Sequence, residues 1–227
     1  MSIIDSLLNL FAPHLCLGCG NEGSLLCDAC SHGLVTAQTE CYFCRQPALD
    51  SVTCDSCFER AGLRQVVVAT LYSDQARQLV RKLKFNGAQA AAGVMAGLLP
   101  SLEITGELIV VPVPTATSRV RGRGYDQAEL LGRALAKRQG HSYLPCLRRY
   151  GQSHQVGADR SARLSQLAEA FIVARPERIR GKQVLLVDDV ITTGATFEAA
   201  ALVLHAAGTA GVSAVAFARP EYDGGMV

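Results

Sequence analysis

The segment over residues 184–196 constrains the fold of this 227-residue chain more than any other. Four apolar residues over 184–187, typical of a buried strand, lead directly into two acids, Asp188 and Asp189. Open α/β folds bind ligands at the carboxyl ends of their strands, and a helix N-terminus presents backbone N–H groups that suit a phosphate. We therefore predict a site for a phosphorylated ligand, with a turn made of Thr192, Thr193, Gly194, Ala195 and Thr196.

The two acids and the glycine have separate roles in this prediction. Asp188 and Asp189 can hold ribose hydroxyls directly or through Mg²⁺, because this cation prefers oxygen ligands. Gly194 permits a tight turn and a close approach of the backbone to the ligand. The alternative is a strand that ends in an ordinary capped helix, since Thr and Asp are common caps. Two adjacent acids followed by T-T-G-A-T favour the ligand site.

Apolar runs and helical spacing predict that strands alternate with helices over the rest of the chain. This alternation indicates βαβ units, and hence an α/β fold with a mostly parallel sheet flanked by helices. Residues 16–57 are instead expected to form loops and turns. The expected strands cover residues 64–71, 107–113, 183–187 and 212–218, and the expected helices cover residues 74–85, 88–99, 125–139 and 195–207.

Eight of the nine cysteines lie before residue 58, in four C-x-x-C pairs. Each pair can point two thiolates at one metal, and two pairs complete a tetrahedral Zn²⁺ site with no open position. Redox pairs of the thioredoxin type are the alternative, but these usually occur singly at the start of a helix. We predict a head over residues 1–60 with two structural zinc ions, followed by a larger domain over residues 61–227. The simplest pairing is sequential, with Cys16, Cys19, Cys27 and Cys30 on one ion and Cys41, Cys44, Cys54 and Cys57 on the other; an interleaved pairing is the open alternative.

The N-terminal segment bears on location. Residues 1–13 lack a basic n-region and carry Asp5 inside their apolar stretch, which argues against a signal peptide and a secreted disulfide framework. Their apolar residues fit one face of a short amphipathic helix that packs on its own protein. No apolar run approaches the about 20 residues that a membrane span needs. We therefore expect a cytoplasmic protein with no membrane span and with reduced thiols.

Charge is divided between the same two parts of the chain. Residues 1–57 hold one basic residue against six acidic ones, whereas the remainder holds 21 basic and 14 acidic residues, with arginine in excess over lysine. Arginine is the residue favoured for bidentate contact with phosphate. The basic part of the chain is therefore compatible with a phosphate-bearing ligand or with a nucleic-acid backbone.

Several motifs, taken in order, resemble one family. The segment 184–196 is similar to the signature of type I phosphoribosyltransferases. The cysteine head, Leu83-Lys84-Phe85, Val111-Pro112-Val113-Pro114 and the segment over residues 121–130 narrow the resemblance to the ComF-like proteins. The resemblance runs from Cys16 to about Arg219. It implies a type I phosphoribosyltransferase-like fold, in which a mostly parallel sheet is flanked by helices and carries an added hood, behind an N-terminal double zinc-ribbon-like head.

The resemblance also implies roles for particular residues. The acidic pair contacts the ribose of phosphoribosyl pyrophosphate, with Mg²⁺, and the following turn binds its 5′-phosphate. Thr115 and Ala116 are expected on the pyrophosphate side. Arg119, Arg121 and Arg123 resemble part of a mobile flap, and Gly122 and Gly124 favour a flexible loop there; solvated arginines are the alternative.

A few other positions either allow two interpretations or differ from the family pattern. Lys84 can reach phosphate or end a solvated helix. Tyr125-Asp126 stands where the family more often has Phe-Asn. Gln155, Arg160 and Arg163 fit the family pattern, whereas Gln166 replaces a usual Asn.

The function implied by the resemblance is binding of phosphoribosyl pyrophosphate and Mg²⁺, linked to natural competence and uptake of single-stranded DNA. Its partners would then be single-stranded DNA and competence-machinery proteins. Two alternatives are an active phosphoribosyltransferase (pentosyl transfer) of nucleotide metabolism and a non-catalytic sensor of phosphoribosyl pyrophosphate. No catalytic residue is identified: His154 is the nearest candidate base, and a lone histidine in a polar segment rarely has such a role. The small number of aromatic residues limits the supply of platforms for base stacking.

Overall fold

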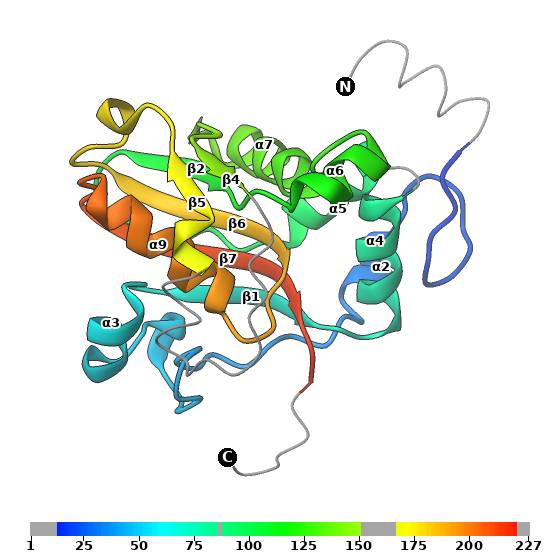
Figure 1. Ribbon diagram of the computed structural model, residues 1–227. Coiled ribbons are helices and arrows are strands. Elements are labelled where there is room, and N and C mark those ends of the chain that lie inside the picture. Colours follow the sequence, from blue (N-terminus) through cyan, green and yellow to red (C-terminus); the bar gives the residue numbers. More distant parts are fainter. Residues whose placement is uncertain (1–12, 86–87, 151–166, 222–227) are drawn as a thin grey trace, which may run out of the picture.

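A five-stranded parallel sheet forms the centre of the computed structural model, which describes residues 13–85, 88–150 and 167–221 (Figure 1). The strand order is β1-β7-β6-β2-β3, and every neighbouring pair is parallel. The inner strands are almost continuously apolar because helices cover both faces of the sheet. The strands are β1 (Val66–Leu71), β2 (Leu108–Pro112), β3 (Ser142–Tyr143), β6 (Gln183–Val190) and β7 (Gly211–Arg219).

Helices pack on both faces of this sheet (Figure 1). On one face, α4 (Asp74–Lys84), α5 (Ala88–Leu98) and α7 (Gln127–Gln139) form a buried cluster with alternate residues of the strands, Val110, Leu185 and Phe217 among them. On the other face, α9 (Ala195–Ala206) packs on the intervening strand residues, such as Val111, Leu186 and Ala214. This division follows from the period of two along a strand.

A small antiparallel pair, β4 (Leu147–Arg149) and β5 (Phe171–Val173), corresponds to the expected hood. Leu147 and Phe171 are buried in the cluster on the α9 face. The short helix η2 (Pro176–Arg178) follows β5 and leads into β6. The pair therefore packs on the α9 side of the sheet.

The cysteine-rich segment contacts both faces of the sheet and runs past the outer strand β1. It contains three short helices, α2 (Asp28–Ser31), η1 (Leu49–Ser51) and α3 (Asp55–Ala61). The backbone N–H of Leu71 in β1 donates to the carbonyl of Val35 over 2.8 Å. Residues near the first cysteine cluster, such as Leu25, join the core beside α4 and α5, whereas Tyr42 joins the core beside α9. The segment is thus part of both cores.

All eight strands and helices expected between residues 64 and 218 are confirmed, with ends that differ by three residues or fewer. Strand β6 extends through both acids to Val190. Two expectations are wrong. Residues 16–57 contain helical turns as well as loops, and the expected flexible loop around Gly122 is a helix, α6 (Thr117–Arg123), which ends at Gly124 in the left-handed conformation with a φ of 79°.

Some expectations fall outside the described residues. These are the N-terminal amphipathic helix and the positions Gln155, Arg160, Arg163, Gln166 and His154. Within the described ranges, no helix is long and apolar enough to cross a membrane. Helix α3 spans the expected domain boundary at residue 60, and Leu63 directly after it is fully buried. The division into two domains stays a prediction.

Replacement of Leu63 by alanine tests how firmly the cysteine-rich segment is joined to the sheet. Leu63 is 0% exposed in the cluster on the α9 face, so Leu63→Ala is expected to lower the free energy of unfolding by about 2–5 kcal/mol. The control is Leu202→Ala on α9, where the side chain is 50% exposed and the change should stay within about 0.5 kcal/mol. Urea denaturation measures both. Equal stability of the two variants would contradict a well-packed joint.

Candidate functional site

The candidate site lies at the carboxyl edge of the sheet, where β2 and β6 end side by side. Pro112 pairs with Val187, and the N–H of Val113 donates to the carbonyl of Val187 over 3.0 Å. The parallel register therefore brings the loop after β2, with Thr115 and Ala116, next to the two acids of β6. This is the edge at which open α/β folds bind ligands.

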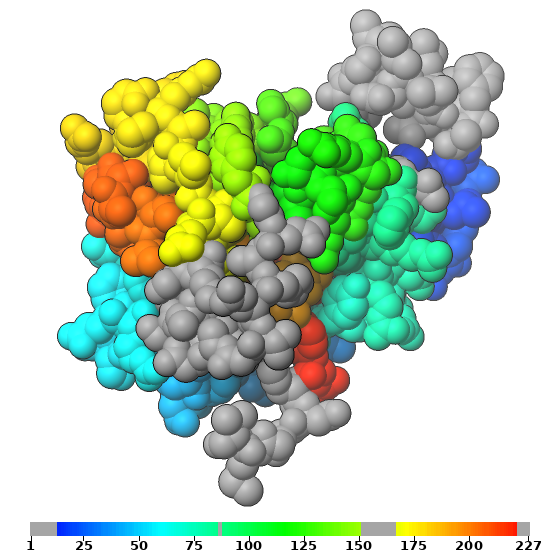
Figure 2. Space-filling model, viewed as in Figure 1, coloured from blue at the N-terminus to red at the C-terminus, as the bar shows by residue number. Residues whose placement is uncertain are grey.

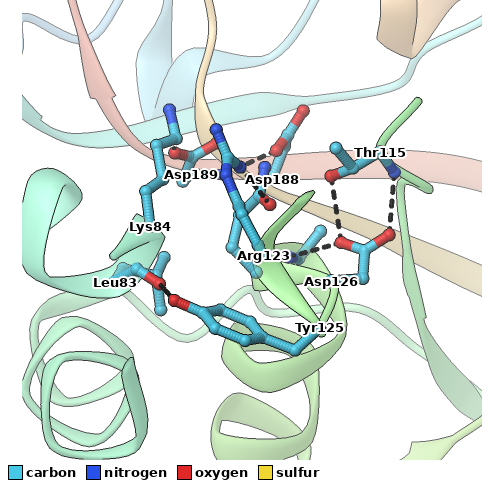
Figure 3. Close-up of polar contacts among 10 residues, drawn as sticks. Leu83, Lys84, Thr115, Arg123, Tyr125, Asp126, Asp188 and Asp189 are labelled. Carbon is cyan, nitrogen blue, oxygen red and sulfur yellow. Dashed lines mark hydrogen bonds and ion pairs between the residues drawn. The ribbon is translucent and has the colours of Figure 1, made fainter. Parts of the chain in front are cut away.

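The two acids at the end of β6 have different surroundings (Figure 3). Asp189 is buried, and its Oδ2 lies 2.6 Å from Nζ of Lys84 at the end of α4. Asp188 accepts a hydrogen bond from the N–H of Asp189 and is partly exposed. Loss of hydration and the negative charge of Asp189 raise the pKa of Asp188 well above its usual value, while Lys84 opposes this shift. One acid is thus neutralised by a lysine, and the other faces the site with a raised pKa.

The turn after β6 presents polar groups over a buried glycine. Thr192 and Thr193 are exposed, whereas Gly194 is buried, has a φ of 84° and caps the N-terminus of α9. A Cβ on Gly194 would lie 2.8 Å from Cε2 of Tyr42, so no larger residue fits there. The first turn of α9, which includes Ala195 and Thr196, directs its backbone N–H groups to the same edge, and the N–H of Ala195 donates to the hydroxyl of Thr193 over 3.4 Å.

Asp126 fixes the loop after β2. Its two carboxylate oxygens accept hydrogen bonds from the N–H of Thr115 over 2.8 Å and from the hydroxyl of Thr115 over 3.0 Å (Figure 3). The same carboxylate caps α7 by accepting from the N–H of Ala128 over 2.9 Å. A carboxylate accepts all three bonds, whereas an asparagine side chain would turn its NH₂ group toward one of these donors. The sequence marked Asp126 only as a departure from a family pattern, and this bracing role was missed.

The three arginines of α6 do not act as one group. Arg119 and Arg121 are exposed. Arg123 donates to Oε1 of Gln127 over 2.8 Å, and its guanidinium lies 5.3 Å from the ring centre of Phe85. The hydroxyl of Tyr125 donates to the carbonyl of Leu83 over 2.9 Å, which ties the turn after α6 to the end of α4.

Arg149 in β4 also lies at the site, although the sequence indicated it only as one of the basic residues compatible with phosphate contact. It is partly buried, and its guanidinium lies 5.5 Å from the ring centre of Phe171. Burial and the nearby charge of Arg119 lower its pKa, while the charge of Asp188 raises it. Within the described residues its buried Nε has no hydrogen-bond partner. A strand of three residues gives no periodic pattern that could have placed this arginine beside the acids.

The cysteines form two clusters with the predicted sequential pairing. In each cluster the four Sγ atoms lie within 4.8 Å of one another. The closest separations fit a tetrahedral ion, because sulfurs about 2.3 Å from zinc are about 3.8 Å apart. These separations are Cys16–Cys27 3.7 Å, Cys19–Cys27 3.8 Å, Cys44–Cys54 3.7 Å and Cys41–Cys54 3.9 Å. The clusters therefore fit one zinc ion each.

Backbone geometry supports metal binding in the first cluster. The N–H groups of Gly18 and Cys27 each donate to Sγ of Cys16 over 3.4 Å. Such donors lower the pKa of Cys16 and so favour its thiolate, the form that binds a metal. A Cβ on Gly18 would lie 2.6 Å from Sγ of Cys30, which restricts this position to glycine. The ninth cysteine, Cys146, is buried apart from both clusters, and burial raises its pKa to about 11.

Residues 139–224 match a family described as the phosphoribosyl transferase domain, and this range includes the acids and the turn of the candidate site. The chain is also similar to DNA utilization protein YhgH of Escherichia coli strain K12, with 30% identity over 228 residues, 89% of this chain and 96% of that protein. Competence protein ComFC of Streptococcus pneumoniae is 28% identical over 88% of this chain and 90% of its own length. Competence protein ComFC of Bacillus subtilis is 26% identical over 75% of this chain and 73% of its own length.

The family match confirms the phosphoribosyltransferase-like fold that the sequence predicted. Because a 30% identical relative aligns with the chain along nearly its whole length, the protein belongs to the ComF-like family, which includes YhgH and ComFC.

Proposed function

We propose that the carboxyl edge of the sheet binds phosphoribosyl pyrophosphate together with Mg²⁺, and that the protein uses this site in the handling of DNA. The arrangement of Asp188 and Asp189 beside the turn over residues 192–196, at the N-terminus of α9, carries the proposal. The matched phosphoribosyl transferase domain supports the ligand. The link to DNA comes from relatives named for DNA utilization and competence.

Each part of the ligand has a counterpart at this edge. The exposed hydroxyls of Thr192 and Thr193 and the N–H groups at the start of α9 suit a 5′-phosphate. The carboxylates of Asp188 and Asp189 suit ribose hydroxyls. The N–H and hydroxyl hydrogens of Thr115 are already donated to Asp126, so Thr115 shapes the loop, and the neighbouring Ala116 and Arg119 would meet the pyrophosphate.

Mg²⁺ fits the acidic pair on charge grounds. Only one of the two adjacent carboxylates has a lysine partner, and loss of hydration together with the negative charge of Asp189 raises the pKa of Asp188. A divalent cation at Asp188 would relieve that excess, and when bound it would neutralise charge on the pyrophosphate. Binding of the ligand is required by the DNA-linked function, the transferase and the sensor alike.

Replacing each acid by asparagine tests the site through two measurements. Both variants should bind the ligand more weakly, whereas their stabilities without ligand should change in opposite directions. Isothermal calorimetry with Mg²⁺ and phosphoribosyl pyrophosphate should show affinity in the wild type and a loss of at least about tenfold, or ~1.4 kcal/mol, in Asp188→Asn and Asp189→Asn. Equal binding by all three proteins would contradict the site assignment.

The stability of the ligand-free variants should move in opposite directions. The raised pKa means that ionised Asp188 costs stability, a cost that appears above the unfolded pKa of about 3.9 and is complete above the folded pKa. Asp188→Asn should therefore be more stable than the wild type at neutral pH and should remove that part of the pH dependence. Asp189→Asn leaves Lys84 without its acid and should lose about 1–3 kcal/mol. Thermal unfolding between acidic and neutral pH measures both effects.

We also propose that each cysteine cluster holds one structural zinc ion, because four thiolates leave no open position for chemistry. Metal analysis should give two zinc ions per chain. Gly18→Ala places a methyl group against Sγ of Cys30 and should lower the content to one. Gly93→Ala in α5 is the control, since nothing lies within 4 Å of its new Cβ, and two ions should remain. A wild type with one ion or none would refute the assignment.

A surface between α4 and α6 favours single-stranded DNA as a second ligand (Figure 2, α6 in green beside α4 in blue-green). Helix α4 carries four basic residues and one acid, and α6 carries three arginines and no acid. Phe85 is 62% exposed beneath Arg123 and lines an open pocket of about 560 Å³ with Gln78, Arg81 and Lys82. An exposed aromatic ring among basic side chains suits base stacking together with phosphate contact.

Variants of this surface should separate stacking from charge. Phe85→Ala should weaken binding of single-stranded DNA by about 1–3 kcal/mol, as expected for one stacked base. Arg81→Ala should weaken binding less and reduce the salt dependence of log K by about one unit. Leu49→Ala, an exposed apolar residue in the acidic head, is the control. Fluorescence anisotropy at several salt concentrations measures all of these, and binding that is independent of salt would count against the proposal.

A further inference from the structure

The second cysteine cluster (Cys41, Cys44, Cys54 and Cys57) contacts, through Tyr42, the turn over residues 192–196, which is called the phosphate-binding turn below. Tyr42 stands between Cys41 and Cys44 in the sequence and is 4% exposed. Its ring occupies the place of the missing side chain of Gly194, because a Cβ there would lie 2.8 Å from Cε2 and 3.1 Å from Cδ2. The hydroxyl of Tyr42 is 3.5 Å from Oε1 of Glu198, a buried residue in the first turn of α9. One side chain from the cluster thus contacts both the turn and the helix that follows it.

A second contact fixes the same part of the chain to the sheet. Glu40 directly precedes Cys41 and forms ion pairs with Arg45, at 2.7 Å, and with the buried Arg219 at the end of β7. The end of β7 borders the turn after β6, since the N–H of Ile191 donates to the carbonyl of Ala218 over 3.0 Å. The second cluster is therefore held at the edge of the sheet where the turn begins.

The first cluster has no such relation to the turn. Cys16, Leu25 and Leu26 are buried in the cluster on the opposite face of the sheet, with α4 and α5. Leu17 stands between Cys16 and Cys19, at the same position in its C-x-x-C pair as Tyr42. It packs against the hydrophobic core beside α4 and α5. The two cysteine clusters thus support different parts of the molecule.

The support beneath Gly194 matters because this residue is the part of the turn that takes the left-handed conformation. Thr192 and Thr193 are exposed, and Gly194 has no side chain that could anchor the backbone in its left-handed conformation. An anion site binds tightly when its donors are already in place, since ordering them on binding costs affinity. The side chain that packs under Gly194 therefore contributes directly to the order of the turn, beside the hydrogen bond from the N–H of Ala195 to the hydroxyl of Thr193.

We propose that Tyr42 is a positioning residue for the phosphate-binding turn, and that the second cysteine cluster, unlike the first, sets the order of this turn and its affinity for phosphoribosyl pyrophosphate. The affinity part rests on the proposed function; the order of the turn does not. Zinc bound by the second cluster would hold the backbone of residues 41–44, and through Tyr42 it would hold Gly194. Loss of metal from this cluster alone would loosen the ligand site while leaving the first cluster intact.

The test compares Tyr42→Ala with the matched Leu17→Ala in the full chain. Tyr42→Ala should weaken binding of phosphoribosyl pyrophosphate with Mg²⁺ about tenfold while keeping two zinc ions, because the ordering of the turn is then left to the ligand. Leu17→Ala should bind as the wild type does. Tyr42→Phe should bind within about threefold of the wild type, because the hydroxyl is at the limit of hydrogen-bond distance from Glu198.

Hydrogen–deuterium exchange over residues 191–198 gives a readout that needs no ligand. The exchange rate there should be higher in Tyr42→Ala than in the wild type. In Leu17→Ala and Tyr42→Phe it should equal the wild-type rate. Cys54→Ser, which removes an exposed ligand of the second cluster, should accelerate this exchange. Cys19→Ser, which removes an exposed ligand of the first cluster, should leave it unchanged. Unchanged exchange in Tyr42→Ala, or equal acceleration in Leu17→Ala, would overturn the inference. Faster exchange in Tyr42→Ala with no binding by the wild type would support the role of Tyr42 and reject the proposed ligand.

Discussion

The ion pair between Lys84 and Asp189 allows two adjacent acids to stand at the end of the central strand. Neighbouring carboxylates repel each other and lose hydration at a packed strand end, so without a cation one of them would be protonated. Lys84 supplies that cation from the last residue of α4, at 2.6 Å. The position of α4 depends in turn on its buried packing against α5 and on the bond from Tyr125 to Leu83. The charge balance of the candidate site is therefore maintained by helix packing on one face of the sheet.

The opposite face supports the phosphate side of the site in a different way. There the turn after β6 rests on Tyr42, which belongs to the second cysteine cluster and to the core beside α9. A cysteine-rich segment has few apolar residues with which to fix its own backbone, and bound metal replaces that missing core. In this protein the segment also fills the space between the sheet and the turn. The proposed metal site and the proposed ligand site would then share one set of contacts, and such sharing requires the segment to pack on the sheet rather than apart from it.

The sequence predicted those parts of the fold whose helices and strands have a regular spacing of apolar residues along the chain. Runs such as residues 107–113 and the spacing of Leu79, Val80 and Leu83 identified the elements that make the cores. The acids and the turn were predictable because they are contiguous. The missed features depend on contacts between distant residues or on very short elements. Gly122 and Gly124 suggested a loop, but Gly124 only ends α6, and the helix before it tolerates Gly122. Arg149 sits in a three-residue strand, and no local pattern connects Tyr42 to Gly194.

Two charged groups at the carboxyl edge, Asp188 and Arg149, have shifted pKa values, whereas Asp189 is paired with Lys84. Loss of hydration and the charge of Asp189 raise the pKa of Asp188, and burial together with the charge of Arg119 lowers the pKa of Arg149. A folded protein that leaves both an acid and an arginine in such states gives up stability at this edge, which is typical of functional sites. A ligand that carries a divalent cation and a pyrophosphate would supply the two missing charges at once. A metal ion alone would act on the acid and a simple phosphate on the arginine, so the charge pattern of this edge agrees with the proposed ligand, a pyrophosphate bound together with a divalent cation.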